Sequence, residues 1–291
     1  MLLEASSMQT LKIYQSLWAM QQRGPDGYEH GNEKSFQMIA DAGYHGVCID
    51  PTADEIAENL ALKPYFEQHG LDVMVNAFPK NGDDLRKLLE FAKQMNATQF
   101  SIIGAVYPMT IAGAIPIVRN WIDIANDVGM PIMFETHRDC ITNDMFFTLQ
   151  LLDEIPEMRL CADLSHYVLN RELSTPLSRE WAALFDRLLA RSDSFQGRIA
   201  NREQIQVPIA FQQHQEWVEL FKHWWSRGIN DWRSRSSEDQ DLIFLCELGP
   251  PPYAITDGQR AELSDRWQEA LTIKSWAEDI WVNSAPISLY S

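Results

Sequence analysis

The amino-acid sequence predicts a single α/β domain folded as a (β/α)8 TIM barrel. Eight short apolar runs alternate with eight helical patterns along the chain, as in proteins built from successive parallel βαβ units. The length of 291 residues suits one barrel of this kind. Because no low-complexity linker divides the chain, we expect an N-terminal tail at residues 1–10 and one barrel domain at residues 11–291.

The expected elements follow in order from these patterns. A strand is expected at each short apolar run, and a helix wherever apolar residues recur at helical spacing. The strands are expected at residues 11–18, 46–50, 71–78, 98–104 and 131–134, and in three runs that begin near residues 160, 194 and 242. The helices are expected at residues 32–42, 53–69, 82–95, 110–128, 143–155, 176–191 and 211–227, and within residues 256–281.

Short sequence signals indicate where several of these helices begin or end. Thr52 is followed three residues later by Glu55, which is the pattern of a capping box at the start of a helix. Gly129 and Gly228 are expected to end the helices that precede them, and a polar loop is expected at residues 233–240.

Composition and charge argue against several classes of partner. The formal net charge is −17 at pH 7, whereas nucleic-acid-binding proteins present basic surfaces, so we expect no nucleic-acid partner. No apolar run approaches the roughly 18 residues that a membrane span requires, and the N-terminus lacks the pattern of a signal peptide. The four cysteines form no CxxC pair and no disulfide framework. We therefore expect a cytoplasmic protein with reduced thiols and no membrane contact, and a homo-oligomer is left open.

Four oxygen donors follow successive apolar runs. The fifth run ends at Glu135 and is followed by His137, and these two side chains share a face because side chains alternate along a strand. The next three runs carry Asp163, Gln196 and Glu247 near their ends. The intervals between successive donors are 28, 33 and 51 residues. The first two intervals match the roughly 31 residues of one βα unit, and the third requires a unit with a longer loop and helix.

These donors predict a metal centre. In a TIM barrel the carboxyl ends of the strands meet on one face, so we expect Glu135, Asp163, Gln196 and Glu247 to converge. Three carboxylates brought together repel one another and raise their pKa values unless a cation neutralises them. Oxygen ligands without thiolates favour one divalent ion: Mg, Mn, Co or Zn. A solvated loop acid is the commoner explanation for any one of these residues alone, but four at the ends of four strands favour the metal site.

Several stretches resemble a known superfamily. Phe-Glu135-Thr-His, Ala-Asp163-Leu-Ser-His166 and Cys-Glu247-Leu-Gly-Pro-Pro-Pro-Tyr253 are similar to the corresponding strands of the xylose-isomerase-like TIM barrels. This group includes sugar isomerases, sugar-phosphate epimerases and dehydratases. The resemblance implies that the first and last glutamates, Glu135 and Glu247, form the catalytic base and acid pair, and that Asp163 is only a ligand.

One position differs from the superfamily pattern. The epimerases of this group usually have histidine where this chain has Gln196. The glutamine carbonyl oxygen still suits a hard cation, although it is a weaker ligand than imidazole.

Five further side chains are expected to bind the substrate. His166 follows Asp163 by three residues and is expected to donate to a substrate oxygen, with a solvated loop histidine as the alternative. His137 and Arg198 are further candidates for binding the substrate or orienting a ligand. Trp18 and Tyr253, each near a strand end, are expected to line the apolar face of a sugar.

Together these features predict a divalent-metal-dependent isomerase or epimerase of a sugar or sugar phosphate. Such an enzyme transfers a proton next to a metal-bound carbonyl. A metal-dependent dehydratase of a keto-polyol is the alternative, because it would use the same metal and the same proton abstraction. A barrel that has lost catalysis and only binds a ligand is a third possibility, which Gln196 keeps open. In each case the partner is a small sugar-like molecule.

Overall fold

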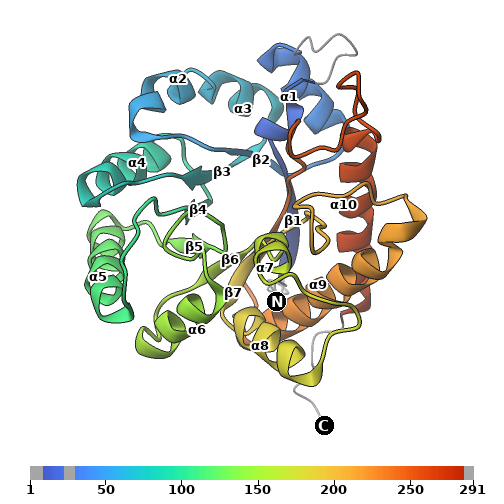
Figure 1. The fold of residues 1–291 in the computed structure, drawn as a ribbon. Helices are drawn as coiled ribbons and strands as arrows, with labels where there is room; N and C mark the ends of the chain where they lie inside the picture. Colours follow the sequence, from blue (N-terminus) through green and yellow to red (C-terminus); the bar gives the residue numbers. More distant parts are fainter. Residues whose placement is uncertain (1–8, 23–29, 285–291) are drawn as a thin grey trace, which may run out of the picture.

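Eight parallel strands form a closed barrel inside a ring of helices (Figure 1) in the computed structural model of this chain, which describes residues 9–22 and 30–284. The strands pair in chain order from β1 to β8, and β8 pairs with β1 to close the barrel. The predicted fold class is therefore confirmed. Most of the expected N-terminal tail, residues 1–8, lies outside the described residues, and Thr10 already belongs to β1.

The elements alternate as a (β/α)8 barrel requires. The strands are β1 (Thr10–Ser16), β2 (Gly46–Ile49), β3 (Asp72–Ala77), β4 (Gln99–Ile102), β5 (Met133–Glu135), β6 (Leu160–Ala162), β7 (Ser192–Gln196) and β8 (Asp241–Cys246). The helices are α1 (Asn32–Asp41), α2 (Ile56–Leu60), α3 (Lys63–His69), α4 (Gly82–Gln94), α5 (Ile111–Val128), α6 (Met145–Glu154), α7 (Ser165–Asn170), α8 (Arg179–Leu189), α9 (Gln215–Arg235) and α10 (Arg266–Asn283). Three short 3-10 helices are η1 (Trp18–Met20), η2 (Ala53–Glu55) and η3 (Gln212–His214).

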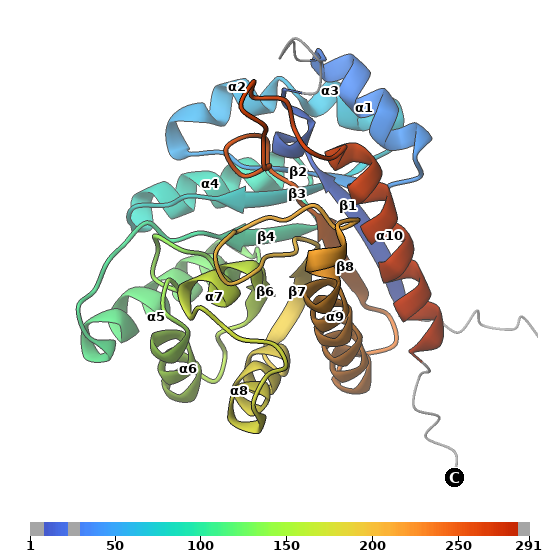
Figure 2. The same ribbon diagram turned by 45° about the vertical axis from the view of Figure 1, so that its right-hand side comes forward.

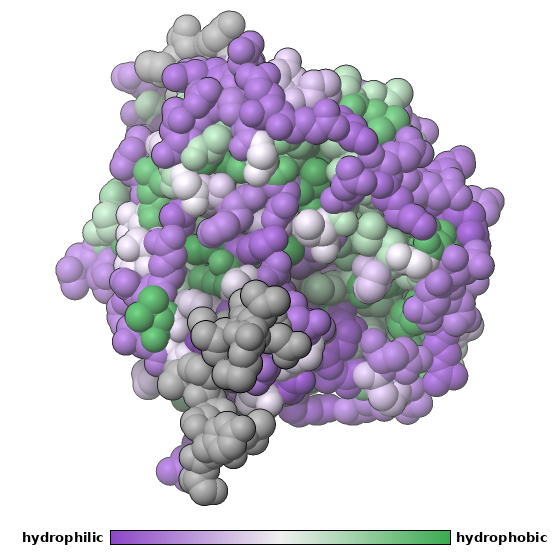
Figure 3. All heavy atoms as spheres, turned by 180° about the vertical axis from the view of Figure 1, so that it is seen from behind, coloured by the Kyte–Doolittle hydropathy of each residue, from purple (hydrophilic) through white to green (hydrophobic). Residues whose placement is uncertain are grey.

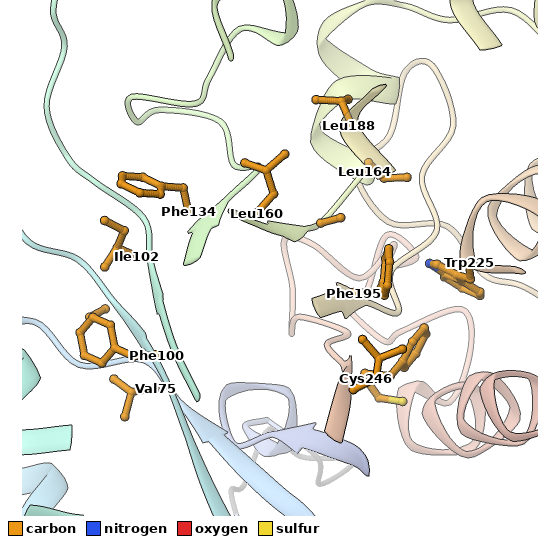
Figure 4. Close-up of a cluster of buried hydrophobic side chains, with 14 of the residues drawn as sticks. Val75, Phe100, Ile102, Phe134, Leu160, Leu164, Leu188, Phe195, Trp225 and Cys246 are labelled. Atoms are coloured by element: carbon orange, nitrogen blue, oxygen red, sulfur yellow. The ribbon is translucent and has the colours of Figure 1, made fainter. Parts of the chain in front are cut away.

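The core has two layers because the strands of a parallel barrel are buried on both faces. The larger layer fills the space between strands and helices, and Figure 4 shows members of it such as Val75, Phe134 and Phe195. The smaller layer fills the barrel interior with Tyr14, Cys48, Met74, Cys161, Ile243 and Leu245. Helix α10 packs alongside β1 and β8 and covers the seam where the barrel closes (Figure 2).

One expected helix is divided. The capping box is present, since the N–H of Thr52 donates to the Glu55 carboxylate at 2.8 Å. The helix expected at residues 53–69 is nevertheless divided into three elements, η2, α2 and α3. Pro64 lies in the first turn of α3 and has no N–H to bond the carbonyl of Leu60, so α2 cannot continue through it.

Gly228 does not end a helix, contrary to the prediction. Helix α9 continues to Arg235, so the first three residues of the loop expected at 233–240 are helical. A Cβ atom at Gly228 would lie 2.4 Å from the ring of Phe195, so the glycine allows α9 to pack against β7. The position requires a small side chain, and a glycine chosen for packing looks the same in the sequence as one that ends a helix.

Three further expectations need correction. Strand β1 ends at Ser16, so Trp18 lies in η1 beyond the strand. Helix α7, which contains His166, was not predicted, because six residues are too few to show a helical period. Helix α10, which begins at Arg266 where the side chain of Asp265 accepts from first-turn N–H groups, ends at Asn283, two residues beyond the segment expected to contain it.

The described residues include no helix long and apolar enough to cross a membrane. From behind the barrel, hydrophilic residues surround separate hydrophobic patches (Figure 3). The large apolar side chains that are exposed among the described residues are Tyr107, Met109, Phe146, Leu263 and Val282, of which Tyr107 and Met109 share the loop between β4 and α5. The homo-oligomer stays a prediction, as does the absence of a nucleic-acid partner.

Glu269 on α10 is expected to make stability depend on pH. Its Oε1 accepts from the N–H of Ile209 at 2.9 Å, and burial raises its pKa to about 7. Because this pKa lies above the unfolded value of about 4.3, the contribution of Glu269 to stability is full below pH 4 and is lost as the pH rises through 7. Glu269→Gln keeps the acceptor without the charge, so it should stabilise the protein by up to about 3 kcal/mol at pH 8 and by less at pH 5. Denaturant unfolding at both pH values measures this difference.

A matched control is Glu278→Gln, on the exposed side of the same helix next to Lys274. This control should show no gain at pH 8. An equal effect of Glu269→Gln at both pH values would contradict the prediction.

Candidate metal centre and active site

The carboxyl ends of β5 to β8 bring the four predicted donors to one end of the barrel. Glu135 and Gln196 are the last residues of β5 and β7, and Asp163 and Glu247 directly follow β6 and β8. All four are buried. One carboxylate oxygen from each of Glu135, Asp163 and Glu247 lies within 4.8 Å of the other two. The structure therefore brings the three carboxylates together.

Arg198 lies among these carboxylates. Its two terminal nitrogens donate to Asp163 Oδ2 and Glu247 Oε2, each at 2.8 Å, and its Nε donates to the backbone carbonyl of Glu247 at 3.1 Å. The side chain is 2% exposed. Arg198 was predicted to bind the substrate or to orient a ligand. In the structure its two terminal nitrogens hold the carboxylates of Asp163 and Glu247, and its Nε holds the backbone of Glu247.

The three carboxylates have different pKa shifts. Burial raises the pKa of Glu135 well above its ordinary value, and the charges of Glu247 and Asp163 raise it further. Burial also raises the pKa of Glu247, to about 7, against the opposing charge of Arg198. Burial of Asp163 acts in the same direction, but Arg198, His166 and Ser165 outweigh it and hold the pKa of Asp163 below its usual range. Asp163 is therefore the carboxylate that stays ionised.

A divalent ion fits this donor set. With all three carboxylates ionised, as metal binding would require, they and one guanidinium would carry a surplus of two negative charges, which one divalent ion would balance. Two buried oxygens, Glu135 Oε2 and Gln196 Oε1, have no hydrogen-bond partner among the described residues. Unpaired buried oxygens are costly, and a hard cation would satisfy both.

Gln196 is weakly held. Among the described residues its side chain makes one hydrogen bond, from Nε2 to Cys161 Sγ at 3.8 Å, and sulfur is a weak acceptor. If Gln196 Oε1 is a ligand, Gln196→His should retain or increase affinity for Mn²⁺, and Gln196→Ala should reduce it about tenfold. Calorimetric titration of chelator-treated protein measures this. Equal affinities for all three proteins would show that Gln196 does not touch the ion.

Two histidines lie against this cluster. The rings of His137 and His166 have centroids 4.0 Å apart, and His166 Nε2 is 3.4 Å from Asp163 Oδ2. His166 is fully buried in α7, which excludes the solvated loop alternative. Burial lowers the pKa of both rings, most strongly for His137, where the neighbouring ring adds to the effect. Both are therefore neutral near pH 7.

A cavity of about 670 Å³ opens above these residues. Glu135, Glu247, His137 and Arg198 line it, whereas Asp163, Gln196 and His166 do not. The four lining residues can therefore contact a ligand in the cavity, whereas the other three lie behind them.

Trp18 and Tyr253 also line the cavity, as expected for residues that cover a sugar ring. Their rings meet edge to face at 5.0 Å, and the guanidinium of Arg198 lies 4.9 Å from the ring of Tyr253. A Cβ at Gly249 would lie 2.2 Å from the indole of Trp18, so this glycine makes room for it. The aromatic pair helps to exclude water from Arg198.

Asp50 is a site residue that the sequence analysis missed. It directly follows β2 and lines the cavity. Burial, and then the charge of Glu247, raise its pKa to about 8. The sequence signal that could have identified it was a carboxylate at the end of a predicted strand, as at Glu135.

Comparisons with known proteins find similarity in fold and none in sequence. No protein-family model matches the chain, and no curated protein matches it by sequence. A xylose isomerase-like TIM barrel protein from Mycobacterium smegmatis, solved with magnesium, has a TM-score of 0.59 and 14% identity over 95% of this chain and 98% of that one. D-allulose 3-epimerase from Methylomonas sp. has a TM-score of 0.58 and 15% identity over 95% and 99%. The probable 3-DHS dehydratase of Bacillus anthracis has a TM-score of 0.55 and 10% identity over 91% and 99%.

The closed eight-stranded barrel with acidic residues at its carboxyl end defines a TIM barrel with an acidic cavity. Its fold is that of the xylose-isomerase-like TIM barrels. At 10–15% identity these neighbours establish the fold and leave the reaction to be inferred from the site.

Removal of two donors should remove the ion. We expect the double variant Glu135→Gln/Asp163→Asn to lose bound divalent metal, because it deletes two of the three charges that attract it. Elemental analysis of protein purified without chelator measures the occupancy, and circular dichroism checks the fold. Full occupancy in the variant would contradict this ligand set.

Proposed function

We propose that this protein is a divalent-metal-dependent isomerase or epimerase of a sugar-like substrate. The observation that carries the proposal is the placement of Glu135 and Glu247, which line one cavity with carboxylate oxygens within 4.8 Å of each other and of Asp163. Isomerisation of a keto sugar requires removal of a proton next to a carbonyl and its return elsewhere, and two carboxyl groups at one cavity suit that task.

The raised pKa values of Glu135 and Glu247 support acid–base roles. A carboxyl group whose pKa lies near the working pH can both accept and return a proton, and the pKa of Glu247 is about 7. Asp163 stays ionised and does not line the cavity, which suits a ligand. Arg198 holds Asp163 and Glu247 in fixed orientations through its two terminal nitrogens.

Glu135, Asp163, Gln196 and Glu247 are the residues that would hold the ion. When bound, a divalent ion would supply Lewis-acid polarisation of a substrate carbonyl. His137 lines the cavity, and its Nδ1 donates to the backbone carbonyl of Arg138 at 2.5 Å. The neutral ring therefore leaves Nε2 as an acceptor for a substrate hydroxyl. His166 lies behind His137 and Asp163 and is placed to orient both. Trp18 and Tyr253 would cover the apolar face of the sugar.

A dehydratase of a keto-polyol is the second candidate. Loss of a β-hydroxyl begins with the same proton abstraction but also needs an acid to protonate the leaving group. Asp50 lines the cavity and has a pKa of about 8, so it is protonated at neutral pH and could fill that role. A solved neighbour of this fold is also described as a probable dehydratase.

The test is proton exchange. The metal-loaded protein is incubated in deuterated water with a panel of ketoses, inososes and their phosphates. At least one compound should gain deuterium next to its carbonyl, and mass spectrometry of the product then distinguishes an isomer from a dehydrated molecule. A protein that holds metal and exchanges nothing across the panel would favour the alternative of a non-catalytic, ligand-binding barrel.

A further inference from the structure

A second group of side chains able to ligate a metal adjoins the carboxylate centre, which consists of Glu135, Asp163, Gln196 and Glu247. In this second group, Glu135, His137 and His166 each offer one donor atom that lies within 4.8 Å of the donor atoms of the other two. Glu135 ends β5, His137 follows it in the next turn, and His166 lies in α7. The two groups share Glu135, but the other two donors of the second group are nitrogens.

Each histidine ring has one nitrogen held by an oxygen and one nitrogen free. His137 Nδ1 donates to the backbone carbonyl of Arg138 at 2.5 Å, which leaves Nε2 with its lone pair in the neutral ring. His166 Nε2 faces Asp163 Oδ2 at 3.4 Å. Arg198 Nη1 is also 3.4 Å from this nitrogen, but it donates to the same Asp163 oxygen at 2.8 Å. Histidines that bind metals are oriented in this way, with the second nitrogen turned to a carbonyl or a carboxylate.

Two of the three side chains have a buried donor atom without a partner. Glu135 Oε2 and His166 Nδ1 form no hydrogen bond within the part of the chain that the structure describes. Glu135 is 1% exposed and His166 is 0% exposed, so both are removed from bulk water. An ion at the carboxylate centre would satisfy Glu135 Oε2 and would leave His166 Nδ1 unpaired. An ion bound by the second group would satisfy both atoms.

The donor set selects among divalent ions. Two imidazoles and one carboxylate, with a further position open to solvent, are the ligands of catalytic zinc sites. Here Glu135 and His137 line the cavity, so such a position would open into it. Imidazole favours Zn²⁺ and Ni²⁺, whereas carboxylate and amide oxygens favour Mg²⁺ and Mn²⁺. The second group therefore suits ions that the carboxylate centre does not prefer.

We propose that Glu135, His137 and His166 form a second metal site, which binds an ion such as Zn²⁺ in competition with the ion at the carboxylate centre. Both sites use Glu135. The carboxylates and Arg198 would carry a surplus of two negative charges, which a single divalent ion already balances. Zn²⁺ at the second site would therefore displace Mg²⁺ or Mn²⁺. The inference goes beyond the proposed function, because it concerns which ion the protein holds and requires no substrate.

X-ray absorption spectroscopy distinguishes the two sites. Imidazole ligands give a characteristic outer-shell scattering, and the carboxylate centre has Gln196 and no histidine among its four donors. Chelator-treated protein is loaded with one equivalent of Zn²⁺ or of Mn²⁺, and each metal edge is measured. We expect imidazole scattering from the Zn²⁺-loaded protein and none from the Mn²⁺-loaded protein.

Two variants should separate the affinities for the two ions. His137→Ala should weaken Zn²⁺ binding by at least about tenfold and leave the affinity for Mn²⁺ unchanged. Gln196→Ala should do the reverse, since Gln196 belongs only to the carboxylate centre. His223→Ala removes an exposed histidine of α9 and should change neither affinity. Calorimetry gives the affinities, the EPR signal of free Mn²⁺ follows its displacement by Zn²⁺, and circular dichroism checks the fold.

Three outcomes would overturn the inference. The first is a Zn²⁺-loaded native protein without imidazole scattering. The second is an equal loss of Zn²⁺ and Mn²⁺ affinity in His137→Ala, because the histidine would then act on a single centre. The third is the simultaneous binding of Zn²⁺ and Mn²⁺ to each chain, which elemental analysis would detect and which would exclude competition for Glu135. Deuterium exchange tests the proposed function separately.

Discussion

Glu247→Gln should reduce deuterium exchange into an active substrate by about 10²–10⁴-fold while leaving the metal bound. Glutamine presents a carbonyl oxygen that can still ligate an ion and accept from Arg198, but it cannot take up a proton. Glu247 lines the cavity and has a pKa near 7, so it is the group most suited to that transfer. Exchange is followed by NMR in deuterated water, and metal content by elemental analysis.

Glu67→Gln serves as the control for a carboxyl-to-amide change outside the cavity and should exchange at the native rate. Exchange that survives in Glu247→Gln would mean that the base lies elsewhere. Glu135, which lines the same cavity, would then be the next candidate.

Arg198→Met should destabilise the metal-free protein by about 3–5 kcal/mol. The substitution keeps an unbranched side chain but leaves Asp163 and Glu247 buried without their partner. Addition of Mn²⁺ should recover much of the loss, because the ion supplies the positive charge that the guanidinium provided. Denaturant unfolding with chelator and with Mn²⁺ measures the two values.

Arg159→Met is the matched control, since Arg159 pairs with Asp193 away from the site and both side chains are more than 20% exposed. Its smaller loss should be the same with and without Mn²⁺. If the loss in Arg198→Met were equally insensitive to Mn²⁺, the carboxylates that Arg198 holds would not belong to a metal site.

The barrel could be predicted because each of its strands and helices is indicated by a pattern of residues close together in the sequence. Each strand is a short apolar run and each helix has its own period, so β2, β5 and α5 could be located to within a few residues. The convergence of Glu135, Asp163 and Glu247 followed from one further rule, that the strands of a barrel all end on the same face. Neither step required knowledge of a distant contact.

The expectations that were wrong or left open concern residues whose local structure depends on packing against residues far away in the chain. Gly228 continues a helix because Phe195 of β7 occupies the space where a Cβ would lie. The sequence analysis also left His166 open as a solvated loop residue, although α7 buries it against His137. In both cases the neighbour that determines the structure is more than 25 residues away in the chain. A local sequence pattern does not show such a contact.

The sequence by itself determined the fold class and the end of the barrel on which the four predicted oxygen donors lie. The tertiary structure alone decided that Arg198 pairs with Asp163 and Glu247, which are 35 and 49 residues away in the chain. It alone decided that Asp163 lies behind the cavity while Asp50 lines it. The physical reason is that alternation and spacing assign a side chain to a face of a strand. Its charge partners and its access to solvent depend on which other strands and loops close over it.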